Sequence, residues 1–323
     1  MELRRLPRAA LVAYALLLAT PLLVPSWVLF ILTLALAKFL AALAVALFLW
    51  AGLVSFGHAL FYGIGAYTVG FSAKWFGVRE ALLLVPLGAL LAAGVAALIG
   101  LFMARYRGVF FAMLNLAVSM ILYAALLKLY WVTGGTDGIG VRSPTFLGVL
   151  PPREIFRTAY YYVTLVITGG VIWAVYRFLA SPLGYFLKAL GDNEIRIEYS
   201  GESVRRILYL TYILSGALGG LAGVLVAFTV GHIVPEYAFW IQSGEFVFVA
   251  LLGGFGSVPG PLVGSIAFEF IRTYASKYAP EAWQMTLGLI MLGIILFRPG
   301  GLWTIYETLA SRFTRSEGGV ARG

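Results

Sequence analysis

Three ionisable residues interrupt long apolar runs of the chain, namely Lys38, Glu245 and Glu269. Charged side chains at the depth of a lipid bilayer are costly, so they usually face the protein interior or a transport path and pair with one another. At about 1.5 Å per helical residue, Glu245 and Glu269 each lie roughly 14 Å from the turn between Gly254 and Gly260. Lys38 comes out at a similar depth, which predicts a Lys–carboxylate pair beside a path. The alternatives are that Lys38 extends to the membrane surface, or that either glutamate caps a helix nearer the surface.

Residue groups that carry out catalysis are missing from the sequence. The chain has no cysteine and only two histidines, His58 and His232, which excludes thiol catalysis and gives no basis for a histidine-built metal site. No serine, histidine and carboxylate set is evident, and the run Gly253–Gly260 lacks the Lys-Ser/Thr of a phosphate-binding loop. We therefore expect no enzyme activity, no catalytic residue, no metal and no cofactor.

The elements that position the charged residues are predicted to be membrane helices. Of the 323 residues, 61% are hydrophobic and only 11% are charged, whereas soluble domains carry about 25% charged residues. Apolar runs of roughly 20 residues match membrane-spanning helices, and the alternating pattern of barrel strands is missing. The sequence predicts an all-α, polytopic membrane protein with about ten transmembrane helices, some of them short or broken by Gly and Pro, the second and third being candidates for broken or re-entrant helices. The predicted spans are residues 9–25, 27–51, 57–76, 81–104, 108–131, 158–179, 207–230, 238–254, 260–276 and 282–298.

Basic residues predict the orientation of these spans. With the N-terminus inside, the cytoplasmic segments hold fourteen Lys and Arg residues and the external segments hold eight. This bias places both termini in the cytoplasm, and it explains the net charge of +9 better than nucleic-acid binding does. The first apolar run is predicted to be an uncleaved span, because no small-residue cleavage site is evident. We expect one membrane domain over residues 1–323, with an external loop at about 132–157, a cytoplasmic loop at about 180–206 and a cytoplasmic tail at about 299–323.

The cytoplasmic loop contains a charged segment, Gly191–Gly201, that a simple connector would not need. Gly191 is predicted to end a first short helix, and one of the next two residues to cap a second. Glu194 and Glu198 are four residues apart and share a helical face. Helices that lie on a membrane surface are usually basic, so this acidic face favours protein docking over an interfacial helix. The docking residues would be Asp192, Glu194, Glu198 and Gly201.

Glycine clusters occur in both halves of the chain. Small residues let membrane helices approach closely, and glycine-interrupted apolar segments are also typical of transport paths. Tight packing is the alternative explanation for the glycines, and packing or local capping is the alternative to gating for His58. The candidate path residues, besides the three charged ones, are Gly57, His58, Gly63, Gly254, Gly256 and Gly260.

Six short motifs in a fixed order carry a family resemblance over about residues 30–305. They are Ser55-Phe56-Gly57-His58-Ala59 with Gly63-Ile64-Gly65-Ala66-Tyr67, Thr133-Gly134-Gly135-Thr136-Asp137-Gly138, Ala189-Leu190-Gly191-Asp192-Asn193-Glu194, Ser215-Gly216-Ala217 through Gly223, Leu252-Gly253-Gly254-Phe255-Gly256-Ser257 with Gly260-Pro261, and Phe297-Arg298-Pro299-Gly300-Gly301-Leu302-Trp303. In these motifs the chain resembles the permease subunits of bacterial and archaeal branched-chain amino acid ABC importers (LivH/LivM family), and it is closer to the LivM-like branch.

The resemblance implies a passive translocation pore in the cell membrane, with ATP hydrolysed by other subunits. The implied partners are a second homologous permease subunit, two cytoplasmic ATP-binding subunits and an extracytoplasmic solute-binding protein. The segment from Glu194 to Gly201 would then be the coupling segment that docks on an ATP-binding subunit. Gly191 and Asn193 depart from the family, whose members often carry a charged or larger residue there.

Other functions remain open at this point. Urea and short-chain amide importers share the same permease family, so the resemblance leaves the substrate undecided between amino acids and amides. A stand-alone carrier driven by an ion gradient would use Lys38, Glu245 and Glu269 for coupling and would need no partner. A membrane-embedded enzyme is the most distant alternative, because the sequence offers no catalytic group for it.

Overall fold

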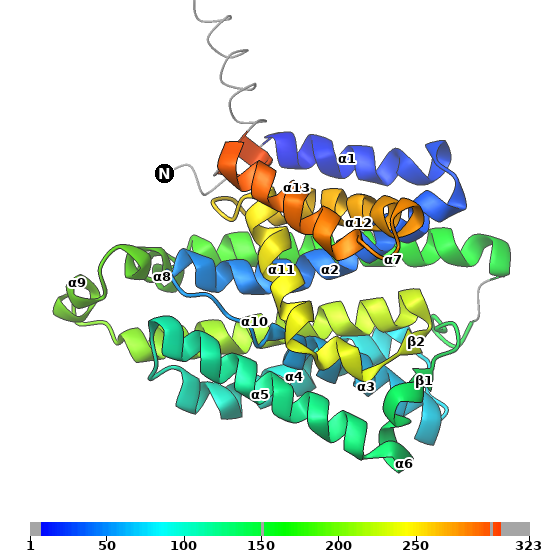
Figure 1. The fold of residues 1–323 in the computed structure, drawn as a ribbon, viewed down its shortest axis with the longest axis horizontal. Helices are drawn as coiled ribbons and strands as arrows, with labels where there is room; N and C mark the ends of the chain where they lie inside the picture. Colours follow the sequence, from blue (N-terminus) through cyan, green and yellow to red (C-terminus); the bar gives the residue numbers. More distant parts are fainter. Residues whose placement is uncertain (1–7, 150–151, 298–299, 305–323) are drawn as a thin grey trace, which may run out of the picture.

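The fold is a bundle of long helices that run roughly along one direction (Figure 1). The computed structural model describes residues 8–149, 152–297 and 300–304, so the predicted tail at 299–323 lies almost wholly outside the described residues. The long helices are α1 (Arg8–Leu23), α2 (Ser26–Trp50), α3 (His58–Trp75), α4 (Ala81–Met103), α5 (Gly108–Lys128), α7 (Arg153–Leu179), α10 (Val204–Val230), α11 (Trp240–Gly253), α12 (Gly260–Tyr278) and α13 (Trp283–Phe297). The short elements are α6 (Tyr130–Thr133), η2 (Gly135–Asp137), β1 (Ile139–Gly140), α8 (Pro182–Asp192), α9 (Glu194–Tyr199), β2 (His232–Ile233) and η3 (Pro235–Ala238).

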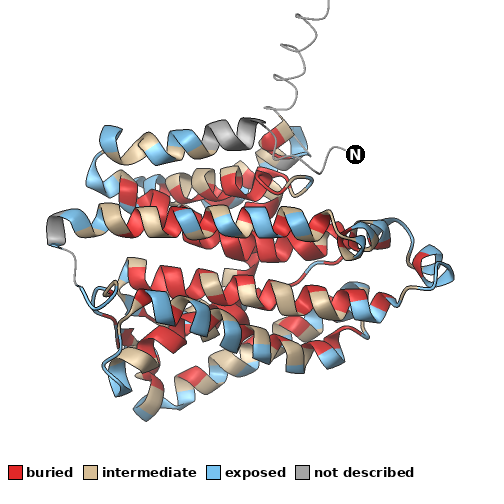
Figure 2. Cartoon of the chain, turned by 180° about the vertical axis from the view of Figure 1, so that it is seen from behind, coloured by how far each residue is buried: buried red, intermediate tan, exposed pale blue. Residues whose placement is uncertain are grey.

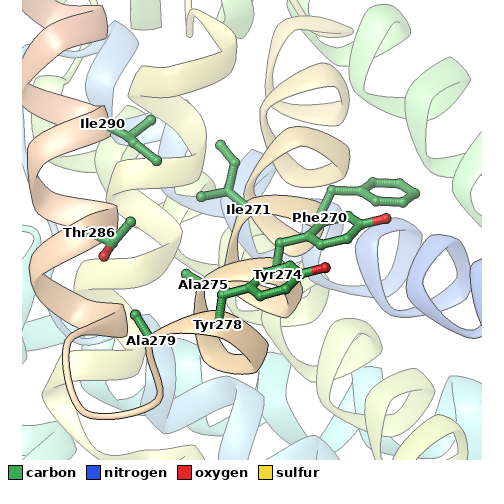
Figure 3. A pocket seen from close by; sticks show the side chains of 8 residues that line it. All are labelled: Phe270, Ile271, Tyr274, Ala275, Tyr278, Ala279, Thr286 and Ile290. Atoms are coloured by element: carbon green, nitrogen blue, oxygen red, sulfur yellow. The ribbon is translucent and has the colours of Figure 1, made fainter.

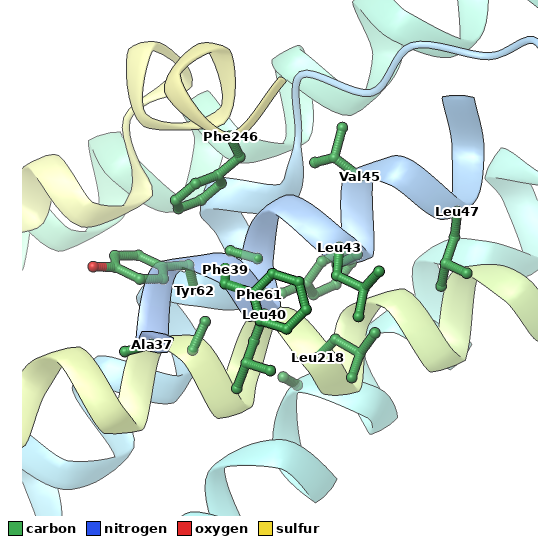
Figure 4. Close-up of a cluster of buried hydrophobic side chains, with 14 of the residues drawn as sticks. Ala37, Phe39, Leu40, Leu43, Val45, Leu47, Phe61, Tyr62, Leu218 and Phe246 are labelled. Carbon is green, nitrogen blue, oxygen red and sulfur yellow. The ribbon is translucent and has the colours of Figure 1, made fainter. Parts of the chain in front are cut away.

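Helices α2 and α10 form the centre of the bundle. Every residue of α2 from Ala35 to Phe48 is buried, and α2 packs against α7, α10, α11 and α12. Outer helices such as α4 and α5 bury one face and expose the other, as the alternation of red and pale blue in Figure 2 shows. A helix that is apolar on all sides is typical of the core of a membrane bundle. The buried side chains of α2, α3 and α11 interlock in one cluster (Figure 4).

Glycines set how closely α10 approaches its neighbours. At Gly65 of α3 a side chain would meet the backbone of Gly220, and at Gly223 it would meet the carbonyl oxygen of Tyr62. Gly216 faces Ala96 of α4 in the same way. Close approach between helix backbones is the usual role of small residues in membrane bundles, so these glycines are explained by packing.

The two ends of the bundle differ in structure. Helices α8 and α9 project at one end, and β1 and β2 lie at the opposite end (Figure 1). The two strands pair antiparallel, with Ile139 opposite Ile233 and Gly140 opposite His232. This small ribbon ties the predicted external loop to the segment after α10. The sequence did not predict this ribbon, because strands of two residues are too short to show an alternating pattern of apolar and polar residues.

Each of the ten predicted spans coincides with one long helix. Five of them, namely α2, α4, α5, α7 and α10, are long and apolar enough to cross a membrane by length and composition. The all-α, polytopic class of membrane protein is therefore established. Helix α2 is one continuous helix of 25 residues, so the suggestion that the second span is broken is wrong. Helix α3 is also continuous but short, with 18 residues.

Candidate translocation site and docking segment

Four charged side chains from α2, α11 and α12 form a connected ladder in the bundle. Arg272 Nη1 lies 3.0 Å from Glu245 Oε2, and the same oxygen lies 3.8 Å from Lys38 Nζ. Lys38 Nζ donates a hydrogen bond of 2.7 Å to Glu269 Oε1. The signs alternate along the ladder and the formal charges cancel. Because Lys38 stands midway between Ser26 and Trp50, the ladder reaches the middle of the central helix.

Hydroxyl groups hold the helices of the ladder in register. Ser265 Oγ, one helical turn before Glu269, donates a 2.7 Å hydrogen bond to the carbonyl oxygen of Ala35, almost one turn before Lys38. The N-terminus of α3 is held to α11, since the N–H of Ala59 donates a 2.8 Å hydrogen bond to Ser243 Oγ. Buried polar groups that satisfy one another in this way fix one arrangement of the helices.

Tyr62 of α3 adds an aromatic wall beside the ladder. Its ring lies 5.2 Å from the ring of Phe246, which follows Glu245 in α11. Figure 4 shows the Tyr62 hydroxyl pointing away from the leucines of the buried cluster. This hydroxyl is buried and has no hydrogen-bond partner among the described residues, and its ring also lies 5.3 Å from the ring of Tyr237. An unpaired buried hydroxyl is costly, which makes it an obvious place for a ligand or water.

A second buried polar group lies around His58, one helical turn from Tyr62. His58 Nδ1 lies 3.0 Å from Ser55 Oγ, while Nε2 is buried and has no hydrogen-bond partner in the part of the chain that the structure describes. At Gly57 a side chain would come within 2.6 Å of the carbonyl oxygen of Asn115. Asn115 in turn accepts a 2.5 Å hydrogen bond from the hydroxyl of Tyr212. Gly57 is thus needed for close packing, and His58 is packed and bonded locally.

The remaining candidate glycines lie in turns and helix contacts. Gly63 faces Ala238, whose Cβ would be 3.0 Å from an added side chain. Gly254 has φ +94 and ends α11 against the backbone of Gly300 and Gly301, two residues of the last sequence motif. Gly260 begins α12 against the carbonyl of Gly254, and Gly256 faces open space. These contacts give most of the glycines a packing or turn role, and their part in a path stays a prediction.

The predicted docking segment is a helix–turn–helix that leaves the bundle. Ser181 caps α8, accepting from the N–H of Gly184 at 3.4 Å, and Asn193 caps α9, accepting from the N–H of Arg196 at 3.1 Å. Helix α8 continues through Gly191 to Asp192, so the prediction that Gly191 ends it is wrong. Gly191 is needed instead because a side chain there would come within 2.7 Å of the carbonyl oxygen of Trp50.

Helix α8 is held against the end of α2. Lys188 Nζ lies 5.5 Å from the centroid of the Trp50 ring, a favourable distance for a cation and an aromatic face. Burial lowers the pKa of Lys188. The docking segment therefore contacts the same central helix that carries Lys38 in its middle.

Helix α9 has one tethered side and one exposed side. Glu194 Oε1 accepts a 2.8 Å hydrogen bond from Arg107 Nε in the turn between α4 and α5, and Ile197 is buried. Ile195 and Tyr199 are 64% and 89% exposed. Asp192, Glu198 and Gly201 are exposed as well, and Gly201 adopts φ +87 in the turn after α9.

A groove of about 450 Å³ lies between α12 and α13 (Figure 3). Its walls include Phe270, Ile271, Tyr274 and Tyr278 of α12. The helical repeat of 3.6 residues places these four side chains on the side of α12 away from Glu269. The groove is thus separate from the charge ladder.

Three of the four ladder residues are predicted from the sequence, namely Lys38, Glu245 and Glu269. The structure brings these three together: Lys38 pairs with Glu269 at 2.7 Å and lies 3.8 Å from Glu245. Their role in transport stays a prediction. Arg272 was missed as a partner because it counted as an external basic residue. Arg272 follows Glu269 by three residues, so the two share one helical face. This spacing is the feature of the sequence from which Arg272 could have been predicted as a member of the ladder. Tyr62 carried no signal, since a lone tyrosine in an apolar helix is ordinary.

The fold and the buried charges define a polytopic membrane protein whose charges lie inside a helical bundle. A family profile described as the permease component of the branched-chain amino acid transport system matches residues 27–296. The chain belongs to this family, as its sequence motifs indicated.

Curated relatives include both permease types. The high-affinity branched-chain amino acid transport system permease protein LivM of Escherichia coli (strain K12) is 29% identical over 276 residues, which cover 78% of this chain and 64% of LivM. LivH of the same strain is 27% identical over 264 residues, covering 76% of this chain and 83% of LivH. The autoinducer 2 import system permease protein LsrC of Klebsiella pneumoniae is 26% identical over 174 residues, covering 51% of this chain and 47% of LsrC. No solved structure matches the chain.

Proposed function

We propose that this protein is the transmembrane permease subunit of an ABC importer and forms part of the path for branched-chain or other hydrophobic amino acids. The family match and the names of LivM and LivH support this substrate class. The chain spans 64% of the length of LivM, so substrate and partners are part of the proposal. The protein itself has no ATPase site or cofactor, and ATP is consumed by partner subunits.

The assembly consists of two permease subunits, two cytoplasmic ATP-binding subunits and an extracytoplasmic solute-binding protein. The chain forms one membrane domain of ten spans with both termini in the cytoplasm, in the cell membrane of a bacterium or archaeon. The charge distribution supports this orientation. The segments at the α9 end include Arg105, Arg107, Lys188, Arg196 and Arg205, and basic residues accumulate on the cytoplasmic side of spans.

The observation that carries the proposal is the exposed side of α9. Ile195 and Tyr199 are 64% and 89% exposed, at the end of the bundle that faces the cytoplasm in this proposal. Large apolar side chains exposed beside polar ones are typical of protein-binding surfaces. Because α8 contacts the end of α2, a subunit bound to α9 has a direct mechanical connection to the centre of the bundle.

The first test is purification of the native complex, followed by reconstitution into lipid vesicles. The complex is expected to contain ATP-binding subunits and to take up leucine only when ATP is supplied. Uptake of acetamide or urea instead of leucine would assign the permease to amides. Uptake by this chain alone, driven by an ion gradient and indifferent to ATP, would overturn the proposal.

The second test addresses the docking segment. Replacing Glu194 and Glu198 with Lys, or Tyr199 with Ala, is expected to weaken association with the ATP-binding subunits while membrane insertion is unchanged. Tyr278→Ala is the matched control, since Tyr278 is 75% exposed at the opposite end of the bundle. Docking through α9 would be refuted if neither the Glu194→Lys and Glu198→Lys double variant nor Tyr199→Ala changes co-purification.

A further inference from the structure

Exposure decreases step by step along the charge ladder. The side chain of Arg272, nearest the end of α12, is 32% exposed, and that of its partner Glu245 is 13% exposed. Lys38 and Glu269 follow, with side chains that are 7% and 3% exposed. The ladder therefore leads from the end of the bundle opposite α9 into its middle, and each contact along it joins a positive group to a negative one.

The chemistry of a solute decides whether it can open such a contact. Separating Lys38 from Glu269 leaves two buried charges unpaired, which is strongly unfavourable in a protein interior. A neutral amide offers neither charge, and a simple anion or cation compensates only one of the two. A zwitterion offers both, since its ammonium group pairs with Glu269 while its carboxylate pairs with Lys38.

Tyr62 supplies the further group that such a site needs. Its hydroxyl is fully buried and has no hydrogen-bond partner among the described residues, and its ring contacts that of Phe246, the residue after Glu245 of the ladder. A carboxylate that inserts beside Lys38 can accept a hydrogen bond from this hydroxyl. The neighbouring ring of Phe246, 5.2 Å from the Tyr62 ring, provides an apolar surface for a hydrophobic side chain.

We infer that the ladder Arg272–Glu245–Lys38–Glu269, together with the Tyr62 hydroxyl, is an intramembrane binding route for α-amino acid zwitterions. The solute replaces one internal ion pair at a time, so no charge is left unpaired while it advances. This inference rests on the amino-acid importer proposed above and adds selection by the permease itself to it. The internal pairs close the route when no zwitterion is present.

The test compares two tyrosines of α3 in the reconstituted complex. Tyr62→Phe removes the hydroxyl beside the ladder, and Tyr67→Phe removes another buried hydroxyl of the same helix, one that also has no hydrogen-bond partner within the described ranges. The measured quantity is radiolabelled leucine taken up per ATP hydrolysed, which does not depend on the yield of assembled complex. Loss of a hydrogen bond to a charged group is expected to lower this ratio about tenfold for Tyr62→Phe, with no change for Tyr67→Phe.

A second variant tests the ion pair itself. Lys38→Met combined with Glu269→Gln keeps the ladder neutral and is expected to lower leucine uptake per ATP at least tenfold. An unchanged ratio for both Tyr62→Phe and the double variant overturns the inference and leaves the importer function intact. An unaltered complex that moves acetamide and not leucine overturns the inference as well, while the permease function stands. Equal losses for Tyr62→Phe and Tyr67→Phe assign the effect to helix packing and also contradict the inference.

Discussion

Two cation–glutamate pairs of this protein have nearly the same geometry in opposite surroundings. Lys38 and Glu269 lie 2.7 Å apart with side chains that are 7% and 3% exposed. Arg107 and Glu194 lie 2.8 Å apart with side chains that are 29% and 37% exposed. The two pairs therefore differ in burial and not in the distance between the nitrogen and oxygen atoms.

The difference fits the two regions to different tasks. A surface ion pair contributes about 0–1 kcal/mol to stability and is screened by salt. Arg107 and Glu194 can therefore separate and bind groups of a partner protein at little cost. In a buried pair, each charge depends on the other, and removing one leaves the other uncompensated. The α9 region is thus suited to reversible docking, and the ladder is suited to staying closed until a solute supplies both charges.

The largest expected effect comes from breaking the buried pair on one side. Lys38→Met leaves Glu269 buried without its cation and is expected to cost about 3–5 kcal/mol of stability. Thermal unfolding of the purified protein in detergent measures this loss. Lys128→Met, an exposed lysine at the end of α5, is the control and should leave the unfolding temperature unchanged. Equal unfolding temperatures for Lys38→Met and the unaltered protein would show that the pair is hydrated rather than buried.

The next largest effect is expected when both members of the buried pair are replaced. Lys38→Met with Glu269→Gln removes both charges, so it should restore most of the stability lost in Lys38→Met. A double-mutant cycle is expected to give a coupling energy of about 2–3 kcal/mol, the upper part of the range for residues in contact. Additive losses in the cycle would contradict direct coupling of the two side chains.

A smaller effect is expected at the surface pair. Arg107→Gln removes the cation beside Glu194 and should cost about 0.2–1 kcal/mol, with a smaller loss in high salt. The same unfolding measurement applies, with Arg105→Gln, the exposed neighbouring arginine, as control. A loss for Arg107→Gln as large as that for Lys38→Met would erase the distinction between the two regions.

The sequence predicts the positions of the ten long helices because each is a long apolar run bounded by polar or glycine-rich turns. It also predicts the depth of Lys38, Glu245 and Glu269, since helical rise converts sequence distance into depth. The partners across helices are not predicted in the same way. That Arg107 would lie beside Glu194, 87 residues away, depends on how the turns pack at the end of the bundle.

For the glycines, too, the sequence predicts that close contacts form but not which residues make them. Their clustering predicts close contacts, and the structure confirms this at Gly65 and Gly223. Which glycine faces which backbone follows from the packing of α3, α4 and α10, and a single sequence does not contain that information. The contact between Gly254 and Gly301 joins two motifs that look independent along the chain.

The smallest expected effect concerns a carboxylate at the end opposite α9. Glu80, just before α4, accepts hydrogen bonds from the backbone N–H groups of Gly148 and Leu147 at 3.0 and 2.7 Å and from the hydroxyl of Thr145 at 2.9 Å. These hydrogen bonds, first that from the Gly148 N–H and then those from Thr145 and Leu147, lower the pKa of this partly exposed carboxylate.

The sign of the pH dependence follows from the lowered pKa. The folded state favours the ionised carboxylate, so Glu80 contributes stability above its unfolded pKa of about 4.3, and the contribution is lost as the pH falls through the lower folded pKa. Glu80→Gln should therefore unfold slightly earlier than the unaltered protein at pH 7, and the difference should vanish in acid. Glu281→Gln, an exposed glutamate just before α13, serves as control. A difference that grows on acidification would mean that the loop is held by contacts other than this carboxylate.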